Sequence, residues 1–164
     1  MIFTDVEGIF YRAIDPAYRT YALSGSQSAG RYSRSTQRTL YLSSSREGVD
    51  AAMQSHKGNR SSALEVITVH VVAKKIVDFR NTLALSALGI RIEDAIAPWQ
   101  ELVSRGAIPS SWAVRDRIVA CGANGLIDPS RKAPGLWHLV LFSWNQDDAP
   151  QVRLLDEAEK ASLK

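Results

Sequence analysis

The sequence predicts one α+β domain in which helices flank a mixed β-sheet. Three observations point to this class. The 164 residues are 45% hydrophobic and 23% charged, which is typical of a single globular domain with its own core. Strand-like and helix-like stretches follow one another without the strict βαβ rhythm of a doubly wound fold. No repeat or linker interrupts them, so residues 1–164 are expected to fold together.

The first third of the chain predicts two short strands around a long polar loop. Residues 8–13 (GIFYRA) mix aromatic and branched side chains, and Asp15-Pro16 ends the run. Residues 24–38 consist mostly of small polar side chains, as in a loop that crosses the surface. Residues 39–43 (TLYLS) predict the next strand.

A helix is expected directly after this second strand and should end near residue 56. Ser44 and Glu47 have the three-residue spacing of a capping box at its start. The apolar face of the helix, at i, i+3, i+4, i+7 spacing, would consist of Val49, Ala52, Met53 and His56.

The middle of the chain predicts two buried strands and a helix. Residues 64–72 (LEVITVHVV) and residues 75–79 are rich in β-branched and apolar side chains, as buried strands are. Residues 92–104 have a helical pattern despite Pro98, and the helix should end at Gly106.

The last third predicts a helix, a buried strand and a polar tail. A helix-start signal at residues 109–111 precedes a helix over residues 112–121, which Gly122 closes. Residues 136–144 (LWHLVLFSW) form the most apolar run of the chain and predict a buried strand. Residues 145–164 are expected to form a polar tail that ends in a frayed helix.

Positive charge is concentrated in the first third. The formal net charge is +3, from 20 Lys and Arg against 17 Asp and Glu. Residues 1–60 hold eight Lys and Arg against five acidic residues, whereas residues 61–164 hold twelve of each. An anionic partner held by polar loops would explain this distribution. Before any motif is considered, a solvated basic surface without a partner is the simpler explanation.

The cysteine count and the apolar runs limit where the protein works. Cys121 is the single cysteine, so an internal disulfide and a zinc site of several cysteines are excluded, and a reducing cytoplasm is expected. The first residues do not resemble a signal peptide. No apolar run approaches the roughly 18 residues of a membrane span. A soluble cytoplasmic protein without a membrane partner is therefore expected.

Several common catalytic and binding motifs are absent from the sequence. It contains no P-loop, no Gly-x-Gly-x-x-Gly, no His-Glu-x-x-His and no Gly-x-Ser-x-Gly. His56, His70 and His138 are far apart, so no metal site is expected. The four tryptophans lie away from the basic segment, where only Tyr32 and Tyr41 interleave with cations. Direct nucleic-acid binding is therefore not expected.

An ordered set of short motifs remains, spread over roughly residues 9–143. The motifs are Tyr11-Arg12, Ser24-Gly25, Gly30-Arg31-Tyr32, Thr39-Leu40-Tyr41-Leu42, and residues 122–131 (GANGLIDPSR) before the apolar strand. Each piece is weak alone. Together and in this order, they resemble the RES domain, a family named after an arginine, a glutamate and a serine.

The resemblance implies a fold and an activity. It implies a mixed, partly split β-sheet with flanking helices, similar to the ADP-ribosyltransferase fold. Members of the family are toxins of bacterial toxin–antitoxin pairs, and their antitoxins carry an Xre-like helix-turn-helix region. They consume NAD by hydrolysis, by phosphorolysis or by transferring ADP-ribose to a protein. The spacing from Arg31 to Tyr41 to position 52 is most similar to the ParT branch, which implies ADP-ribosylation of phosphoribosyl pyrophosphate synthetase.

The resemblance also implies roles for individual residues. A guanidinium presents a fixed fork of donors that matches a pyrophosphate, so Arg31 would bind the pyrophosphate of NAD, with Arg12 and Tyr32 in the same cofactor-binding set. Tyr41 would stack on nicotinamide while its hydroxyl stays in water. Ser130, in a Pro-Ser pair, would orient the ribose. Without the resemblance, Arg31 is a surface arginine, Tyr41 a half-buried strand tyrosine and Ser130 part of a turn.

The carboxylate that this chemistry requires is missing from its expected place. Cleavage of the bond from ribose to nicotinamide builds positive charge on the sugar, and a nearby carboxylate stabilises that charge. By resemblance the glutamate falls on position 52, which is Ala52. Glu47 is the expected capping partner of Ser44, and Asp50 lies about 200° around the helix from position 52. His56 lies one turn beyond Ala52 on the same face and would contact the same ligand.

Three explanations of Ala52 stay open. The chain is a natural member that has lost turnover, or a Glu→Ala variant made so that a toxic enzyme can be produced, or the assignment is shifted by one or two residues. We favour the variant, because the rest of the motif set is intact. The predicted function is an NAD-consuming toxin with a cognate antitoxin and no metal cofactor. The alternatives are a basic RNA-binding module and a non-catalytic interaction domain.

Overall fold

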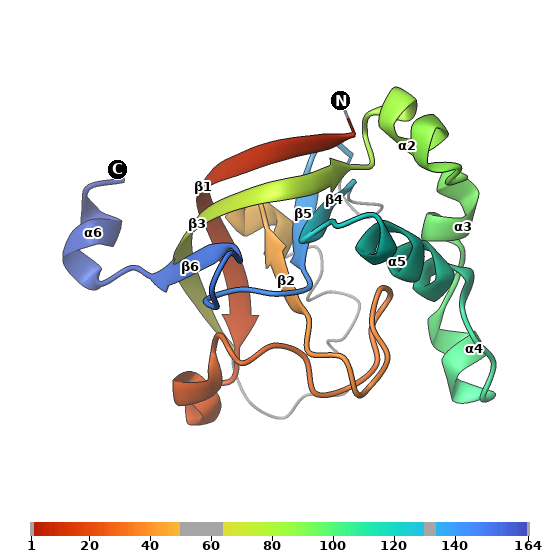
Figure 1. The fold of residues 1–164 in the computed structure, drawn as a ribbon. Coiled ribbons are helices and arrows are strands. Elements are labelled where there is room, and N and C mark those ends of the chain that lie inside the picture. The colour runs from red at the N-terminus through yellow and green to blue at the C-terminus, as the bar shows by residue number, and fades with distance from the viewer. Residues whose placement is uncertain (1, 50–63, 130–133, 164) are drawn as a thin grey trace.

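The computed structural model describes residues 2–49, 64–129 and 134–163, and within these ranges six strands form one mixed sheet. The strands are β1 (Phe3–Ile14), β2 (Leu40–Ser43), β3 (Glu65–Asp78), β4 (Gly125–Pro129), β5 (Trp137–Leu141) and β6 (Gln151–Leu154). Their order is β1-β2-β5-β4-β3-β6, and a further pairing between β1 and β3 closes five of them into a barrel-like ring (Figure 1). The α+β class with a mixed, partly split sheet is therefore confirmed.

Helices flank this barrel, and most of them lie on one side of it. They are a 3-10 helix (Pro16–Tyr21), α2 (Thr82–Leu88), α3 (Ile92–Ile96), α4 (Gln100–Ser104), α5 (Ser110–Ala120) and α6 (Glu157–Ala161), and residues 46–49 are also helical. In Figure 1, α2 to α5 lie together on one side, whereas α6 follows β6 on the other. In the described parts of the chain, no helix is both long and apolar enough to cross a bilayer.

The strand β3 is continuous but kinked, where the sequence predicts two strands. Its backbone turns at Lys75, which has a φ of 60°. Residues 69–72 pair with β6 before the kink, and residues 76–78 pair with β4 after it. Asn124 holds the kink, because its backbone N–H and its side-chain amide donate to the carbonyls of Lys75 and Lys74 at 2.9 and 3.0 Å. Because of the kink, β3 pairs with β6 along its first half and with β4 along its second half.

The barrel is split between β1 and β2. The strand β1 pairs with β3 from Phe3 to Ile14, but pairs with β2 only where Tyr11 lies opposite Ser43. By contrast, β2, β5 and β4 form a continuous antiparallel set. Because directly opposite residues face the same side of a sheet, whole rows of side chains cross these three strands together.

Two expectations about helices need correction. Residues 92–104 form α3 and α4 instead of one helix, because Pro98 lacks an N–H and restricts Ala97 to an extended backbone, with a ψ of 149°. The helix after β2 is capped by Ser45, whose Oγ accepts the N–H of Gly48 at 3.0 Å. The Oγ of Ser44 instead accepts the N–H of Trp137 from β5, so Ser44 and Glu47 do not form the predicted capping box.

The tail contains more structure than its polar composition predicts. Residues 151–154 form β6 against β3, and Asp156 caps α6 through a complete capping box with Glu159. The helix expected at residues 112–121 is present as α5, and the apolar run at residues 136–144 contains β5. The strand β4 and the helix α2 were not predicted.

Two hydrophobic clusters stabilise the fold. The first contains buried residues of all six strands, among them Leu40 and Leu42 of β2. The second joins Leu126 of β4 and Val140 of β5 to apolar side chains of α2, α3 and α5. Side chains alternate between the two faces of a strand, so Tyr41 and Ser43 of β2 lie on the opposite face from Leu40 and Leu42.

Candidate active site

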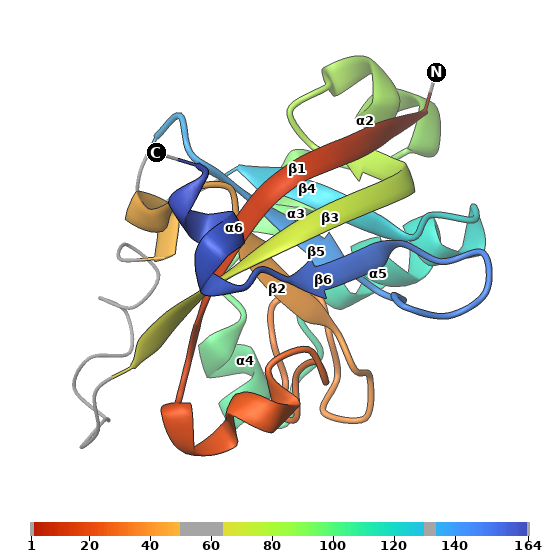
Figure 2. The ribbon, with the colours of Figure 1, turned by 90° about the vertical axis from the view of Figure 1, so that its left-hand side faces the viewer.

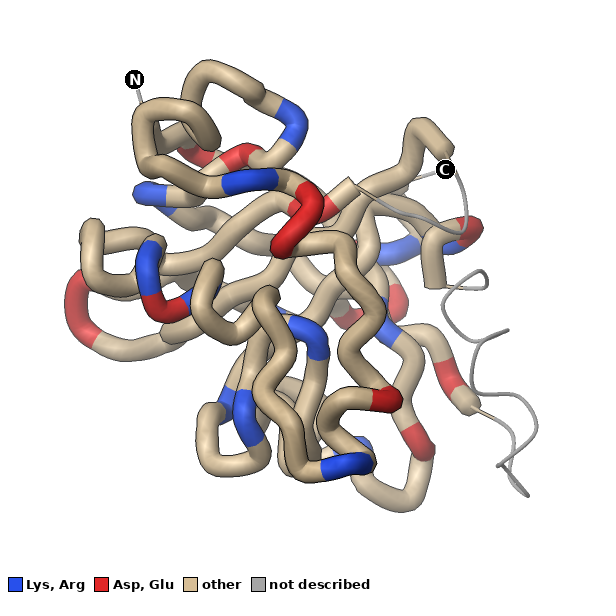
Figure 3. Tube along the Cα trace, turned by 90° about the vertical axis from the view of Figure 1, so that its right-hand side faces the viewer, with Lys and Arg blue, Asp and Glu red and all other residues tan. Residues whose placement is uncertain are grey.

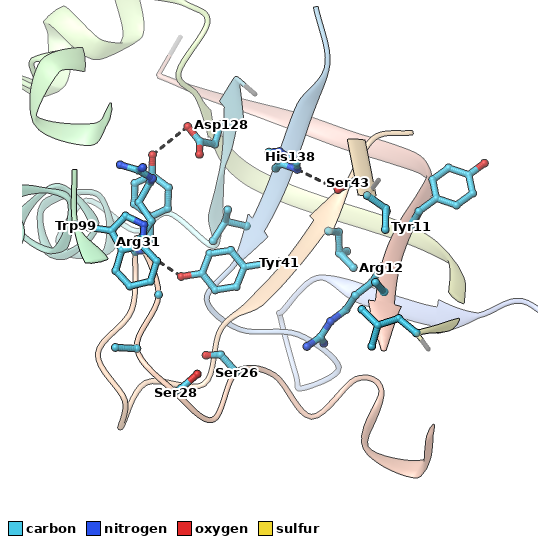
Figure 4. Close-up of a pocket in the computed structure, with 18 residues that line it drawn as sticks. Tyr11, Arg12, Ser26, Ser28, Arg31, Tyr41, Ser43, Trp99, Asp128 and His138 are labelled. Atoms are coloured by element: carbon cyan, nitrogen blue, oxygen red, sulfur yellow. Dashed lines mark hydrogen bonds between the residues drawn. The ribbon is translucent and has the colours of Figure 1, made fainter. Parts of the chain in front are cut away.

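A cleft of about 490 Å³ opens between the polar loop of residues 24–38 and the strands β1, β2 and β5. Four of the predicted site residues line it together, namely Arg12, Arg31, Tyr32 and Tyr41 (Figure 4). The other predicted site positions, Ala52, His56 and Ser130, lie outside the described residues. The cleft therefore joins motifs that are well separated in the sequence.

Tyr41 lies on β2 in the middle of this cleft, but its hydroxyl is not in water. The hydroxyl accepts the backbone N–H of Tyr32 at 3.1 Å and lies 2.7 Å from the Oγ of Ser33. The expectation of a wet hydroxyl is wrong because residues 30–33 form a tight turn that folds over it, with the N–H of Gly30 donating to the carbonyl of Ser33 at 2.9 Å. The ring of Tyr41 still lines the cleft, where a flat ligand would contact it.

The buried hydroxyl of Tyr41 should make stability depend on alkaline pH. Burial raises the pKa of Tyr41 above 10.0, while bonds to Ser33 and Tyr32 and the charge of Arg115 oppose the rise. The stability from this group is complete below pH about 10 and is lost as the pH rises through the folded-state pKa. Denaturation at several pH values should show a steeper loss in the unmodified chain than in Tyr41→Phe. Tyr18→Phe, at a side chain that is 63% exposed, should keep the steep loss; a Tyr41→Phe slope that matches it would contradict this explanation.

Gly30 is required for the close approach of the turn to Tyr41. A Cβ at position 30 would lie 2.6 Å from the Tyr41 hydroxyl oxygen and 3.0 Å from the Oγ of Ser33. We expect Gly30→Ala to push these groups apart and to lower the free energy of unfolding by about 1–3 kcal/mol in urea denaturation. Ser35→Ala, at an exposed position of the same loop, is the control and should change it little. Equal stability of the two variants would show that the turn does not need a glycine.

Side chains of the helix α5 hold the same turn, residues 30–33, by bonding to the backbone of the turn. Three successive carbonyls accept from three of its side chains: Gly30 from Trp112 Nε1 at 2.8 Å, Arg31 from Ser111 Oγ, and Tyr32 from Arg115 Nη1 at 2.8 Å. Bonds from side chains on one helix leave the turn little freedom to rotate. The side chain of Arg31 therefore projects from a fixed point of the backbone.

Arg115 is a buried residue among the α5 side chains that bond to the turn, and it should contribute most to the stability of the turn. It is 7% exposed, it also donates to Thr39 Oγ1 at 2.8 Å, and it lies 4.6 Å from the centre of the Phe142 ring. Arg115→Met would leave the Tyr32 carbonyl and the Thr39 hydroxyl without this donor, so we expect a loss of about 2–4 kcal/mol in chemical denaturation. Arg105→Met, at an exposed arginine, should cost much less. Similar losses in the two variants would contradict a structural role for Arg115.

The guanidinium of Arg31 is positioned by the break between α3 and α4. Its Nη1 donates to the carbonyls of Ala95 and Ala97 at 2.9 and 2.7 Å. These carbonyls point to Arg31 because the helix stops before Pro98. A guanidinium whose direction is already fixed loses less rotamer freedom when it binds an anion.

Arg12 is the second cation of the cleft and comes from β1. Its Nη1 donates to the carbonyl of Ala22 at 2.9 Å, and it has no carboxylate partner in the described chain. Burial lowers the pKa of the Arg12 guanidinium, because the charged form is removed from water. A half-buried cation without a carboxylate gains free energy from an anionic ligand. Arg12 thus favours a negatively charged occupant of the cleft.

Tyr32 supports the cleft from the hydrophobic side. It is 1% exposed, its ring meets Phe79 edge to face at 6.1 Å, and its hydroxyl donates to the Oδ1 of Asp128 at 3.0 Å. These contacts hold the loop against β4. The predicted contact of Tyr32 with the cofactor stays a prediction.

Sequence reasoning missed a row of three polar residues in this cleft. Ser43, His138 and Asp128 lie opposite one another on β2, β5 and β4, and all three line the cleft. The Oγ of Ser43 is 3.1 Å from the Nδ1 of His138. Asp128 is the one acidic residue among the described residues that line the cleft. The available signals were the place of Asp128 two residues before Ser130 and the interruption of an apolar run by His138.

Aromatic residues lie closer to the basic segment in space than in sequence. Trp99 lines the cleft, and Arg34 lies over Trp112 at 5.2 Å from the ring centre. Arg34 is also bound by both carboxylate oxygens of Asp116 at 3.0 Å. Figure 3 shows Lys and Arg interspersed with Asp and Glu on that side of the molecule. This pattern differs from the continuous basic surface of a nucleic-acid-binding protein.

Comparisons with known proteins agree with the motif set. The RES domain family matches residues 9–163 of the chain. The chain belongs to the RES family. In structure it is similar to the M. tuberculosis MbcT–MbcA toxin–antitoxin complex, with a TM-score of 0.66 and 14% identity over 94% of this chain and 84% of that chain. At this identity the likeness shows the fold alone. The sequence matches no curated protein.

The RES match includes the tail as well as the predicted core of residues 9–143. It covers β6 and α6, which lie in the segment predicted to be a polar tail. Within the ranges that the structure describes, no three His, Cys, Asp or Glu side chains are grouped so that they would hold a metal ion. The expectation that this RES domain works without a metal stays a prediction.

Proposed function

We propose that this RES chain is the toxin of a bacterial toxin–antitoxin pair and that its cleft binds NAD. The observation that carries the proposal is the pairing of two arginines with an aromatic ring in one cleft, where Tyr41 is drawn between Arg12 and Arg31 in Figure 4. Membership of the RES family and the fold shared with a toxin–antitoxin complex support it. The toxin would act in the cytoplasm, where NAD and its targets are present.

The cleft has a suitable group for the charged and the flat parts of NAD. Arg31 and Arg12 would bind the pyrophosphate, because guanidinium donors match phosphate oxygens and Arg12 is otherwise a half-buried cation without a carboxylate in the described chain. The ring of Tyr41 would stack on nicotinamide. The cleft volume of about 490 Å³ falls within the roughly 300–1,000 Å³ of small-molecule sites.

Cleavage of NAD at the nicotinamide–ribose bond needs negative charge near the ribose. We propose that position 52 is where the family carries its catalytic glutamate and that Ser130 and His56 orient the ribose, as the resemblance implies. Because Ala52 carries no charge, this chain would bind NAD without turning it over. Asp128, whose Oδ1 accepts the hydroxyl of Tyr32 at 3.0 Å, would place negative charge at the wall of the cleft.

The acceptor and the partners are proposed from the resemblance to the ParT branch. ADP-ribose would pass to a protein, and phosphoribosyl pyrophosphate synthetase is the implied target. An antitoxin with an Xre-like helix-turn-helix region would cover the cleft. The expected similarity to the ADP-ribosyltransferase fold stays a prediction.

Isothermal titration calorimetry with intact NAD on the antitoxin-free chain tests this proposal. We expect one NAD per chain, and we expect ADP-ribose to bind more strongly than nicotinamide because it carries the pyrophosphate. A chain that lacks only its carboxylate retains the ground-state contacts of the substrate. No NAD binding, together with salt-sensitive RNA binding, would instead support the RNA-binding module.

Hydrolysis or phosphorolysis of NAD is the second possibility within the same family. The two arginines would bind NAD in either case, so binding does not distinguish them from protein modification. Products of a chain with a restored glutamate do distinguish them: free ADP-ribose indicates water as acceptor, a phosphorylated ADP-ribose indicates phosphate, and a mass shift of a protein indicates transfer. Antitoxin binding without NAD binding would favour a non-catalytic interaction domain.

A further inference from the structure

The strand β1 has one edge that no strand of the described chain covers. Along residues 3–10 it pairs with β3 on one side, and on the other side its pairing with β2 is confined to Tyr11 and Ser43 (Figure 2). In the described residues, no loop or turn backbone hydrogen bond reaches residues 3–10 either. An uncovered strand edge presents alternating N–H and C=O groups that can pair with another strand.

A second cavity, of about 350 Å³, runs along this edge. It is lined by every residue from Thr4 to Phe10, and its far wall includes Ile127 and Trp137. Because successive side chains of a strand face opposite sides, seven consecutive residues line one cavity only when the cavity follows the strand edge. A Cβ added at Gly8 would meet no atom within 4 Å. The cavity therefore lies where a neighbouring strand would lie.

The walls of this slot differ on its two sides. Phe10 is 3% exposed and meets Trp137 edge to face at 5.5 Å, which makes the inner wall mainly apolar, and the guanidinium of Arg80 lies 4.8 Å from the centre of the Trp137 ring. Asp5 and Glu7 are exposed at its rim, and in the described chain neither has a basic partner. Arg80 does not balance them, because its guanidinium already bonds to both carboxylate oxygens of Asp78 at 2.9 Å.

We propose that this slot receives an extended segment of a partner protein, in which basic and apolar residues alternate. The segment would add as a strand beside β1, with its apolar side chains toward Phe10 and Trp137 and its basic side chains toward Asp5 and Glu7. A second copy of this chain fits less well, because β1 paired with β1 would bring Asp5 and Glu7 close to the same acidic residues. The proposal does not use the residues of the NAD cleft, so either proposal can fail alone.

The peptide Lys-Val-Lys-Val-Lys-Val, acetylated and amidated, is the probe for this slot. We expect it to bind the full chain and to slow amide hydrogen exchange at residues 4–10 at least ~10-fold. The peptide with Glu in place of Lys should bind at least ~10-fold more weakly, because its charges repel the rim. Asp5→Lys combined with Glu7→Lys should reverse this preference. Glu101→Lys combined with Asp147→Lys, which changes the net charge equally at exposed sites, should retain it.

Three outcomes would overturn the proposal. They are no binding of the basic peptide at a concentration of about 1 mM, binding without protection of residues 4–10, and equal binding of the acidic and basic peptides. A concentration-dependent dimer with residues 4–10 protected in the absence of peptide would instead assign the slot to a second copy. Calorimetry with NAD on the charge-reversed variant should be unchanged, which separates this test from the proposed function.

Discussion

Arg31→Gln is expected to weaken NAD binding by roughly 30- to 100-fold, because it removes a charged donor pair from the pyrophosphate. The present structure supports a large effect, since the bonds from Arg31 to Ala95 and Ala97 hold the guanidinium at the cleft wall before a ligand arrives. Calorimetry with intact NAD measures the change. The NAD affinity of Arg31→Lys should lie between that of the unmodified chain and that of Arg31→Gln, because lysine keeps the charge but not the fork of donors.

Arg38→Gln is the matched control for this variant. Arg38 lies in the same loop and is exposed, and within the described ranges its side chain makes one hydrogen bond, a long one of 3.4 Å to the carbonyl of Ser24. Its replacement removes the same formal charge without touching the cleft. If both variants lost affinity equally, a diffuse charge effect would explain binding, and the specific role of Arg31 would be wrong.

Ala52→Glu is expected to turn a binding protein into an active toxin. A carboxylate beside the ribose stabilises the positive charge that develops as nicotinamide leaves, so NAD consumption should rise by at least ~100-fold. Expression of Ala52→Glu without antitoxin should also arrest bacterial growth. Nicotinamide release measured by chromatography gives the rate directly.

Ala51→Glu is the control for position, because on the helix that the sequence predicts it would place the same charge about 100° away from position 52. Activity in Ala51→Glu and not in Ala52→Glu would show that the assignment is shifted by one residue. Inactivity of both, in chains that still bind NAD, would indicate a natural member that has lost turnover through more than one change. Activity in Ala52→Glu alone would identify position 52 as the place of the carboxylate.

The sequence predicted the elements whose signals are local. The strand β5 lies in the most apolar run, and α5 lies between a helix-start signal and Gly122. The strands β4 and β6 have five and four residues, and each is stabilised by pairing with β3, which is distant in sequence. Because of the kink at Lys75, β6 pairs with the first half of β3 and β4 pairs with the second half. A lysine at this position does not predict a kink.

In the candidate site, too, the residues with local sequence signals were predicted and the contacts that depend on tertiary structure were not. Arg12, Arg31, Tyr32 and Tyr41 lie within motifs, so an ordered motif search finds them. Their contacts follow from tertiary structure: the Tyr41 hydroxyl is buried because a turn held by α5 folds over it. Asp128 and His138 were missed because they meet only through the register of β4 and β5.

A crystal structure of this chain with intact NAD shows whether the cleft holds the substrate, because Ala52 should leave NAD uncleaved. We expect the pyrophosphate to lie against the guanidinium groups of Arg31 and Arg12 and the nicotinamide ring to lie against Tyr41. NAD bound elsewhere on the molecule, or an NAD orientation that places the pyrophosphate away from both arginines, would contradict this expectation.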